Sequence, residues 1–246
     1  MKLYGLIGYP LGHSFSQNFF NEKFASERID ARYMNFEIPN IGYLAKILSE
    51  KNELKGFNVT IPYKQQIIPM LNELDPVAKT IGAVNVVKVM QRRGRVWLKG
   101  FNTDAPAFED SIRPLLQKHH ERALVLGTGG ASMAVTYALD QLGISPQLVS
   151  RTERPGVLTY KDLSPEVMEA HTVVVNCTPV GMYPRIDECP SIPYGQLTSR
   201  HLLYDLLYNP DSTLFMQNGM AQGATVKNGI EMLLLQAIAS WRIWES

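Results

Sequence analysis

The amino-acid sequence predicts an α/β protein of two domains, one of which binds a dinucleotide. Short apolar stretches alternate along the chain with longer stretches of helical spacing. One apolar stretch, residues 123–126, runs directly into a turn with three glycines and then into a helix. Several other apolar stretches end in turns rich in Gly, Pro and hydroxyl side chains, and open α/β sheets bind their ligands at such strand ends.

Composition excludes several classes of function. The 246 residues carry 24 basic and 23 acidic side chains, so no broad electrostatic field recruits nucleic acid or a membrane surface. We find no apolar run that could span a bilayer and expect no signal peptide. Cys177 and Cys189 are too few for a disulfide framework or a metal cluster. We therefore expect a cytoplasmic protein with reduced thiols and no metal.

The N-terminal part is expected to begin with a strand at 3–7 and a ligand-binding loop at 8–16. In the helix that follows, at 17–28, only one of Ser14 and Ser16 can be the N-cap, so the other is available for a ligand. His13, a lone histidine of this loop, is interpreted as structural.

Lys64 is predicted to be functional. After a strand at 31–38 and a helix at 41–49, a strand at 56–60 leads into a helix with Pro62 in its first turn. Lys64 then lies near a helix N-terminus, where the helix dipole opposes a cation. A lysine needed only for solvation would more naturally lie elsewhere.

A β-hairpin is expected around a turn at 91–95, and Asp104 follows its second strand. Asp104 is either the cap of a helix at 105–117 or a functional carboxylate.

The glycine turn is predicted to hold a pyrophosphate. Gly127, Gly129 and Gly130 let the backbone turn tightly after the strand at 123–126. The free N–H groups of the helix at 133–142 then face the negative charge. The pattern departs from G-x-G-x-x-G at its last position, which is Ser132 after Ala131.

The end of the next strand, at 147–149, favours NADP. An NAD site normally places a carboxylate there, whereas a 2′-phosphate needs cations and hydroxyls. Arg151, Thr152 and Arg154 supply these groups, and Glu153 is the counter-indication.

The rest of the chain completes this second domain. Strands are expected at 172–176, from His201, and at 224–226, with a helix at 214–222 and Cys177 as a packed thiol. The closing helix, 230–244, is apolar on most sides and is expected to be well buried, with Gln236 as a buried amide. We expect this helix to return to the first domain. The domains are then 1–101 plus 229–246, for substrate, and 102–228, for the dinucleotide.

The polar residues of the first domain suit a small polyhydroxylated carboxylate. They are Ser14, Ser16, Asn58, Thr60, Lys64, Asn85, Asp104 and Gln236. Reduction of a ketone needs a proton for the developing alkoxide, which Lys64 can give while Asp104 holds the lysine and a substrate hydroxyl.

Taken together, these residues resemble the shikimate dehydrogenase family, whose members reduce 3-dehydroshikimate with NADPH. The resemblance covers the chain in order and includes Gly8–Ser16, Phe57–Lys64, Gly82–Asn85, Gly100–Asp104, Gly127–Ser132, Asn176–Met182, Tyr204–Pro210 and Asn228–Gln236.

The resemblance implies a role for each matching residue. Lys64 and Asp104 match the catalytic pair. Substrate-binding positions match Ser14, Ser16, Asn58, Thr60, Asn85, Tyr208 and Gln236. Cofactor-binding positions match Gly127, Gly129, Gly130, Ala131, Ser150, Arg151, Thr152, Arg154, Thr178, Met182 and Gly229. The implied ligands are shikimate or 3-dehydroshikimate and NADP, with no nucleic acid or membrane partner and a monomer or homodimer as the active form.

Departures from the family pattern keep alternatives open. Gln17 replaces a proline, Val86 a threonine and Ser150 an asparagine, and Arg154 falls one position early. The nearest alternative is a quinate/shikimate dehydrogenase with relaxed cofactor use. One that prefers NAD should show an acidic residue at the end of the second cofactor strand, and Ser150-Arg151-Thr152 argues against that. The other is a non-catalytic nucleotide- or shikimate-binding module, which would have lost Lys64 or Asp104. A methylene-tetrahydrofolate dehydrogenase does not fit the serine pair or the Asn-Thr-Asp motif.

Overall fold

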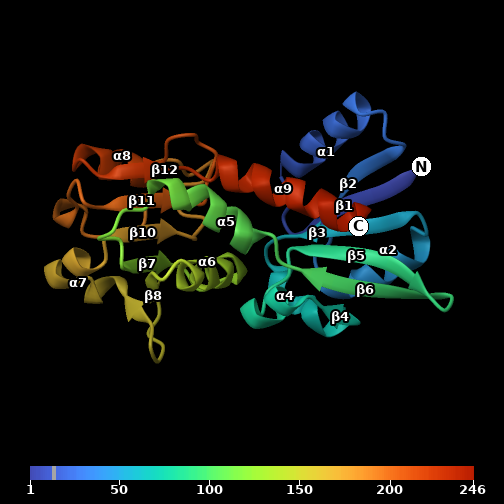
Figure 1. Cartoon of the computed structure of the whole chain (residues 1–246), viewed down its shortest axis with the longest axis horizontal. Helices are drawn as coiled ribbons and strands as arrows, with labels where there is room; N and C mark the ends of the chain where they lie inside the picture. The colour runs from blue at the N-terminus through green and yellow to red at the C-terminus, as the bar shows by residue number, and fades with distance from the viewer. Residues whose placement is uncertain (13–14) are drawn as a thin grey trace. The chain divides into compact units, whose positions relative to one another are not determined.

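The computed structural model describes residues 1–12 and 15–246, so the predicted positions His13 and Ser14 lie outside the described residues. The chain forms two compact units (Figure 1). Unit 1 contains residues 1–103 and 237–246, and unit 2 contains residues 104–236. The boundary therefore falls directly before Asp104 and within the last helix, α9 (Ile230–Glu245).

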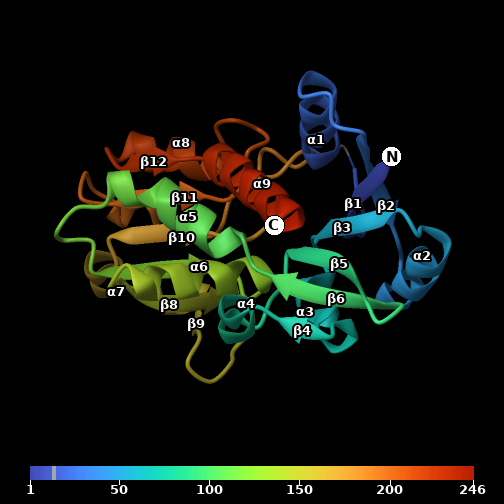
Figure 2. The same cartoon turned by 45° about the vertical axis from the view of Figure 1, so that its right-hand side comes forward.

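Unit 1 is built on a mixed sheet of six strands in the order β2-β1-β3-β5-β6-β4. The strands are β1 (Lys2–Gly8), β2 (Ala31–Glu37), β3 (Leu54–Val59), β4 (Glu73–Leu74), β5 (Val86–Arg92) and β6 (Arg95–Phe101). β1 pairs in parallel with both β2 and β3, whereas β5 is antiparallel to β3 and β6. The predicted hairpin is confirmed and is seen in Figure 2. Its turn residues Arg93 and Gly94 both have positive φ, which is the conformation of a type I′ turn.

Helices cover both faces of this sheet. They are α1 (Phe15–Ser26), α2 (Leu44–Glu50) after the short 3-10 turn Ile41–Tyr43, α3 (Tyr63–Gln66), and α4 (Pro76–Ile81), with a further 3-10 turn at Ile68–Met70. One core cluster joins the sheet to α2, α3 and α4 through Leu44, Tyr63 and Ala78. The other is aromatic and joins the sheet to α1 and the end of α9 through Phe20 and Trp244.

The structure corrects two expectations in unit 1. The helix that carries Lys64 has only four residues, and Pro62 is its N-cap rather than a residue of its first turn. Because so short a helix has few aligned peptide dipoles, the dipole argument for Lys64 loses its force. The helix α4 was not expected, although Asp75 caps it by accepting a hydrogen bond from the Val77 N–H.

Unit 2 is built on a parallel sheet of six strands in the order β12-β11-β10-β7-β8-β9. The strands are β7 (Arg122–Leu126), β8 (Ser145–Ser150), β9 (Leu158–Thr159), β10 (Val173–Asn176), β11 (Leu202–Asp205) and β12 (Thr225–Lys227). Read from β9, this is the 3-2-1-4-5-6 order of dinucleotide-binding sheets, and the order reverses between β7 and β10. The predicted Rossmann-like fold is thus confirmed.

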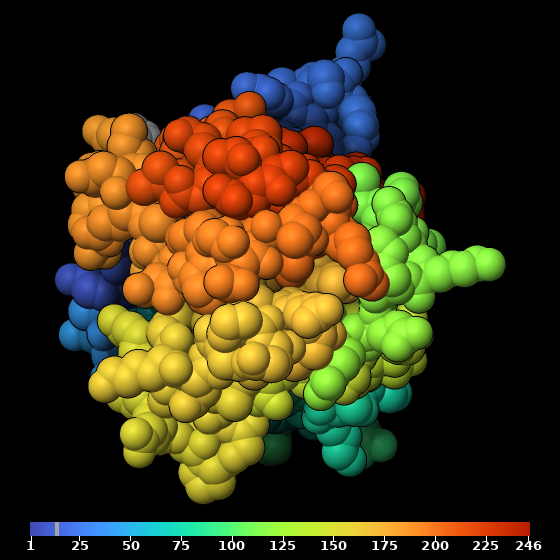
Figure 3. All heavy atoms as spheres, turned by 90° about the vertical axis from the view of Figure 1, so that its left-hand side faces the viewer, coloured from blue at the N-terminus to red at the C-terminus, as the bar shows by residue number. Residues whose placement is uncertain are grey.

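The helices of unit 2 are α5 (Asp104–Ile112), α6 (Gly130–Gln141), α7 (Pro165–Ala170) and α8 (Leu214–Ala221), with 3-10 turns at Arg113–Leu115, Tyr160–Asp162 and Tyr194–Gln196. Phe108 of α5 packs edge-on against Tyr204 of β11, whose hydroxyl is 2.7 Å from that of Ser111. Figure 3 shows a face of unit 2 on which light green, yellow and orange segments, far apart in the sequence, lie side by side.

Two helix boundaries and two further elements of unit 2 differ from expectation, as does the burial of α9. α5 ends at Ile112 rather than 117, because Pro114 has no N–H group to continue the helical hydrogen bonds, and the chain goes on in the 3-10 turn Arg113–Leu115. α6 begins three residues earlier than expected, and β9 and α7 were not expected. The expectation that α9 is well buried is wrong. Only one stripe of the helix is buried, at Met232, Ala237, Ser240 and Trp244, and Ile238 is 40% exposed.

Candidate active site

The glycine turn between β7 and α6 leaves room for a ligand on its backbone. Gly127 has a φ of +109°, and a Cβ there would lie 3.3 Å from Ser132 Oγ and from Thr178 Cγ2. Gly129 is the N-cap of α6, and no described atom lies within 4 Å of the place a Cβ would take. Gly130 and Ala131 open the helix, so their N–H groups have no partner within it. This turn fits a pyrophosphate.

The end of β8 is shaped by Ser150. Its buried hydroxyl accepts a hydrogen bond from the Thr152 N–H at 3.2 Å and lies 3.3 Å from the Thr152 hydroxyl. Ser150 stands at the position where the pattern described above has an asparagine. Arg151 and Thr152 themselves are exposed, which leaves a guanidinium and a hydroxyl available at the strand end. Cation and hydroxyl together suit a phosphate monoester.

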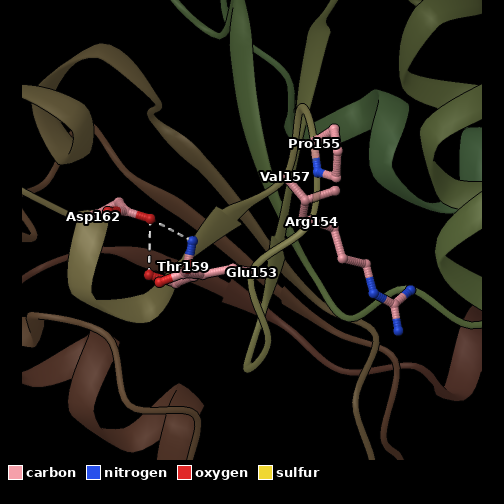
Figure 4. Close-up of a pocket in the computed structure, with 6 residues that line it drawn as sticks. All are labelled: Glu153, Arg154, Pro155, Val157, Thr159 and Asp162. Atoms are coloured by element: carbon pink, nitrogen blue, oxygen red, sulfur yellow. Dashed lines mark hydrogen bonds between the residues drawn. The ribbon is translucent and has the colours of Figure 1, made fainter.

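Arg154 reaches from this strand end to the glycine turn. Its Nη1 lies 3.4 Å from Thr128 Oγ1, between Gly127 and Gly129. Glu153, Arg154, Pro155, Val157, Thr159 and Asp162 line a shallow depression here. Figure 4 shows the Arg154 side chain pointing away from Asp162, whose carboxylate accepts hydrogen bonds from the N–H and hydroxyl of Thr159. The structure therefore brings a second cation to the glycine turn despite the shifted position of Arg154 in the sequence.

The loops after β10 and β11 lie at the same edge of the sheet. They carry three predicted residues, Thr178, Met182 and Tyr208, of which Met182 and Tyr208 are partly exposed. Burial of the Tyr208 ring nevertheless raises the pKa of its phenol. Gly229 stands where a side chain is impossible, because a Cβ would lie 2.1 Å from the Leu206 carbonyl oxygen. The backbone is thus in close approach at the start of α9.

In unit 1, the predicted amides are buried and engaged with the protein. Asn58 accepts a hydrogen bond from the Tyr33 hydroxyl at 2.8 Å and donates to Ser240 Oγ at 2.9 Å. Asn85 accepts from the Thr103 N–H at 2.7 Å and donates to Thr103 Oγ1 at 2.9 Å. These contacts fix the two amides firmly. Burial raises the pKa of Tyr33, and a hydrogen bond with Ser16 opposes that shift.

The remaining predicted residues divide between the units. Ser16, Thr60 and Lys64 are half-buried in unit 1. Asp104 is 5% exposed and is the first residue of both unit 2 and α5. Gln236, in α9, is the last residue of unit 2. Gln236 is half-buried rather than fully buried, and its Nε2 donates to the Leu233 carbonyl at 2.7 Å.

Two further polar residues were missed by sequence reasoning. Asn176 and Asp205 are the last residues of β10 and β11 and are fully buried. A signal was present, because each is a polar residue that closes an otherwise apolar strand. Among the described residues, no group of His, Cys, Asp or Glu side chains could hold a metal ion. The described helices are all too short or too polar to cross a membrane.

The fold and this site define a class of protein: two-unit α/β proteins with a dinucleotide-binding sheet. Residues 6–87 match the family model of the shikimate dehydrogenase substrate binding domain. The chain is 36% identical over 259 residues to a shikimate dehydrogenase (NADP(+)) of Carboxydothermus hydrogenoformans, covering 99% of this chain and 91% of the relative.

Solved structures agree. A shikimate dehydrogenase from Aquifex aeolicus matches with a TM-score of 0.85 and 35% identity, over 99% of this chain and 92% of the other. An enzyme of Thermus thermophilus, solved with NADP(H) and shikimate, matches with a TM-score of 0.85 and 29% identity, over 99% and 93% of the two chains. The chain belongs to the shikimate dehydrogenase family.

Proposed function

We propose that this chain reduces 3-dehydroshikimate to shikimate with NADPH, in the biosynthesis of aromatic compounds. The observation that supports it best is the similarity to NADP(+)-dependent shikimate dehydrogenases along 99% of the chain. Its own residues agree with that activity, since Lys64 and Asp104 are both present and Arg151 stands where an NAD site would have a carboxylate.

We assign NADP to the domain 102–228 and substrate to the domain 1–101 plus 229–246. In the NADP domain, the glycine turn holds the pyrophosphate. The residues around the 2′-phosphate are Ser150, Arg151, Thr152 and Arg154. Thr178, Met182 and Gly229 take the nicotinamide half. The substrate residues are Ser14, Ser16, Asn58, Thr60, Asn85, Tyr208 and Gln236. Asn58 and Asn85 also brace the sheet, so we assign them to the wall of the pocket.

When bound, NADPH supplies the hydride that reaches the carbonyl carbon. Lys64 acts on the carbonyl oxygen, where negative charge develops, and supplies the proton or the hydrogen bond that stabilises the alkoxide. Asp104, the carboxylate of the pair that the resemblance implies, accepts a hydrogen bond from a substrate hydroxyl.

The first experiment follows NADPH absorbance with 3-dehydroshikimate, with NADH in parallel. Fast oxidation of NADPH alone is expected, and no oxidation of either cofactor by folded protein would overturn the proposal. Replacement of Lys64 by Ala should lower kcat about 10²–10⁴-fold with little change in KM, as expected for a group acting in the transition state. The matched control is Lys79→Ala, which removes an exposed lysine of the same unit. An unchanged kcat would remove Lys64 from the mechanism.

A second variant tests the choice of cofactor. Arg151→Ala should weaken NADPH by about 10–100-fold and NADH hardly at all, because only NADPH loses a charged hydrogen bond. Arg200→Ala is the control, since it removes an exposed arginine just before β11, at the opposite end of the parallel strands. Equal losses for the two cofactors would show that Arg151 does not contact the 2′-phosphate.

We also place the protein in the cytoplasm, as a monomer or homodimer. Cys177 and Cys189 form no disulfide, which agrees with a reducing compartment. Light scattering of the purified protein would measure the oligomeric state.

A further inference from the structure

Two neighbouring strands of unit 2 end in buried polar side chains that contact each other. Asn176 closes β10, Asp205 closes β11, and the two are register partners with no exposed surface. Asn176 Nδ2 donates to Asp205 Oδ1 at 3.0 Å. None of the ion pairs found among the described residues involves Asp205. The carboxylate is therefore balanced by hydrogen bonds.

Those hydrogen bonds come from both sides. Asp205 Oδ1 also accepts from the Leu207 N–H at 3.1 Å, and Oδ2 accepts from the Thr213 hydroxyl at 2.6 Å. Burial raises the pKa of Asp205 to about 6, and the three donors oppose that shift. An apolar side chain of similar volume would avoid the cost of burying a carboxyl group. The role of Asp205 therefore lies in the segments that it orders.

Each donor controls a different segment at the carboxyl edge of the sheet. Asn176 Oδ1 accepts from the N–H and hydroxyl of Thr178, at 3.0 and 2.7 Å, and so fixes the loop after β10. The Leu207 carbonyl accepts from the Gly229 N–H at 2.9 Å, which links the loop after β11 to the start of α9. Thr213 is the N-cap of α8. One carboxylate thus joins both loops.

We propose that Asp205 is a positioning residue that sets the nicotinamide half of the dinucleotide site. This inference rests on the proposed use of NADP. In a sheet of this order, one half binds the adenosine part of the dinucleotide and the other half binds the nicotinamide part. The residues proposed for the 2′-phosphate of the adenosine follow β8, so the half β7–β9 binds the adenosine. The loops after β10 and β11, with Thr178 and Tyr208, then fall to the nicotinamide half.

Asp205→Leu is the informative change because it removes both carboxylate oxygens and keeps a side chain of similar size. Asn176, Leu207 and Thr213 then all lose their acceptor, and an apolar side chain cannot replace it. The loops after β10 and β11 are released, whereas the glycine turn after β7 keeps its hydrogen bond from the Gly127 N–H to the Val149 carbonyl.

The test compares two ligands by calorimetry, NADP⁺ and adenosine 2′,5′-bisphosphate, which contains only the adenosine half. In Asp205→Leu, the Kd of NADP⁺ should rise about tenfold or more, because the donors that order the two loops lose a charged acceptor. The Kd of the bisphosphate should stay within about twofold of the wild-type value. Asp140→Leu, which makes the same change at an exposed carboxylate on α6, is the matched control.

Three different results would contradict either the role of Asp205 or the proposed use of NADP. Equal weakening of both ligands would show general damage to unit 2, and unchanged NADP⁺ binding would show that Asp205 positions nothing; either overturns the inference. A wild-type protein that binds neither ligand would overturn the proposed function itself. If Asp205→Leu fails to fold, Thr213→Val and Thr213→Ser replace it. The valine variant should weaken NADP⁺ alone, and the serine variant should restore it, since serine keeps the hydroxyl donor.

Discussion

Trp244→Ala tests whether the last turns of α9 are an integral part of unit 1. Trp244 is 5% exposed in the aromatic cluster. Its ring stacks on Tyr4 with centroids 4.9 Å apart and lies 5.3 Å from the Phe20 ring. Its indole Nε1–H donates to the Val87 carbonyl of β5 at 3.1 Å. One side chain thus joins the helix to the sheet and to α1.

The loss of stability expected for Trp244→Ala follows from these contacts. Truncation of a buried tryptophan to alanine costs about 3–5 kcal/mol, including the cavity that it leaves. The lost indole N–H also leaves the Val87 carbonyl without that donor, which favours the upper part of the range. With an m-value of about 2.5 kcal/mol/M in urea, a loss of about 4 kcal/mol lowers the midpoint of unfolding by about 1.6 M.

Tryptophan fluorescence provides an assay of unit 1 alone. The chain has 3 tryptophans, Trp97, Trp241 and Trp244, and all lie in unit 1, so two reporters remain in the variant. Ile238→Ala is the control on the same helix, where 40% exposure predicts a loss below about 1 kcal/mol. A midpoint shift for Trp244→Ala no larger than that of the control would refute the docking of α9 on unit 1.

Two further predictions concern unit 2. Burial lowers the pKa of His120 and of His171 from 6.5, so the unfolded chain takes up protons first and their stabilising contribution is lost as the pH falls below 6.5. Burial raises the pKa of Asp205 from 3.8 to about 6, so its contribution to stability changes with pH in the opposite direction between those values. We therefore expect the double variant His120→Gln/His171→Gln to lose stability less steeply than wild type in urea titrations from pH 7 to about 5. An unchanged dependence of stability on pH would contradict the assignment to the two histidines. Gly229→Ala should lower the Tm of unit 2, since its Cβ would lie 2.1 Å from the Leu206 carbonyl oxygen, whereas Gly195→Ala, with no described atom within 4 Å, should not; equal Tm values would refute the close approach.

The parallel sheet of unit 2 could be predicted from sequence because its signals are local. The strands around 123–126 and 172–176 are short apolar runs that end in polar or glycine turns, and such runs are typical of buried parallel strands. The two missed helices also had local signals. α4 begins at Asp75-Pro76 and ends at Gly82, which has a φ of +73°, and α7 begins at Ser164-Pro165. Attention to caps would have found both.

Other features could not be predicted because they depend on contacts distant in sequence. The helix α9 is apolar on most sides, yet it buries a single stripe, and which stripe is decided by where Tyr4, Phe20 and Val87 lie in unit 1. Similarly, Asn58 looked like a ligand-binding amide. Its contacts to Tyr33 and Ser240, far away in the chain, show that it also joins β2 and α9.

The predicted site residues also differ in how much support their surroundings give them. Thr178 is hydrogen-bonded to Asn176, and Gly229 is hydrogen-bonded to Leu207. Asn176 and Leu207 in turn both donate to the buried carboxylate of Asp205. Arg151 and Thr152 are exposed, and the Ser150 hydroxyl accepts a hydrogen bond from the Thr152 N–H. On the proposed assignment, the hydrogen-bonded residues serve the nicotinamide and the exposed residues serve the 2′-phosphate, and this difference suits the two tasks. The reacting ring has to be held at a fixed geometry, since a misplacement of about 1 Å can cost about 10²-fold in rate. The 2′-phosphate needs only to be attracted and retained, which flexible charged groups can do.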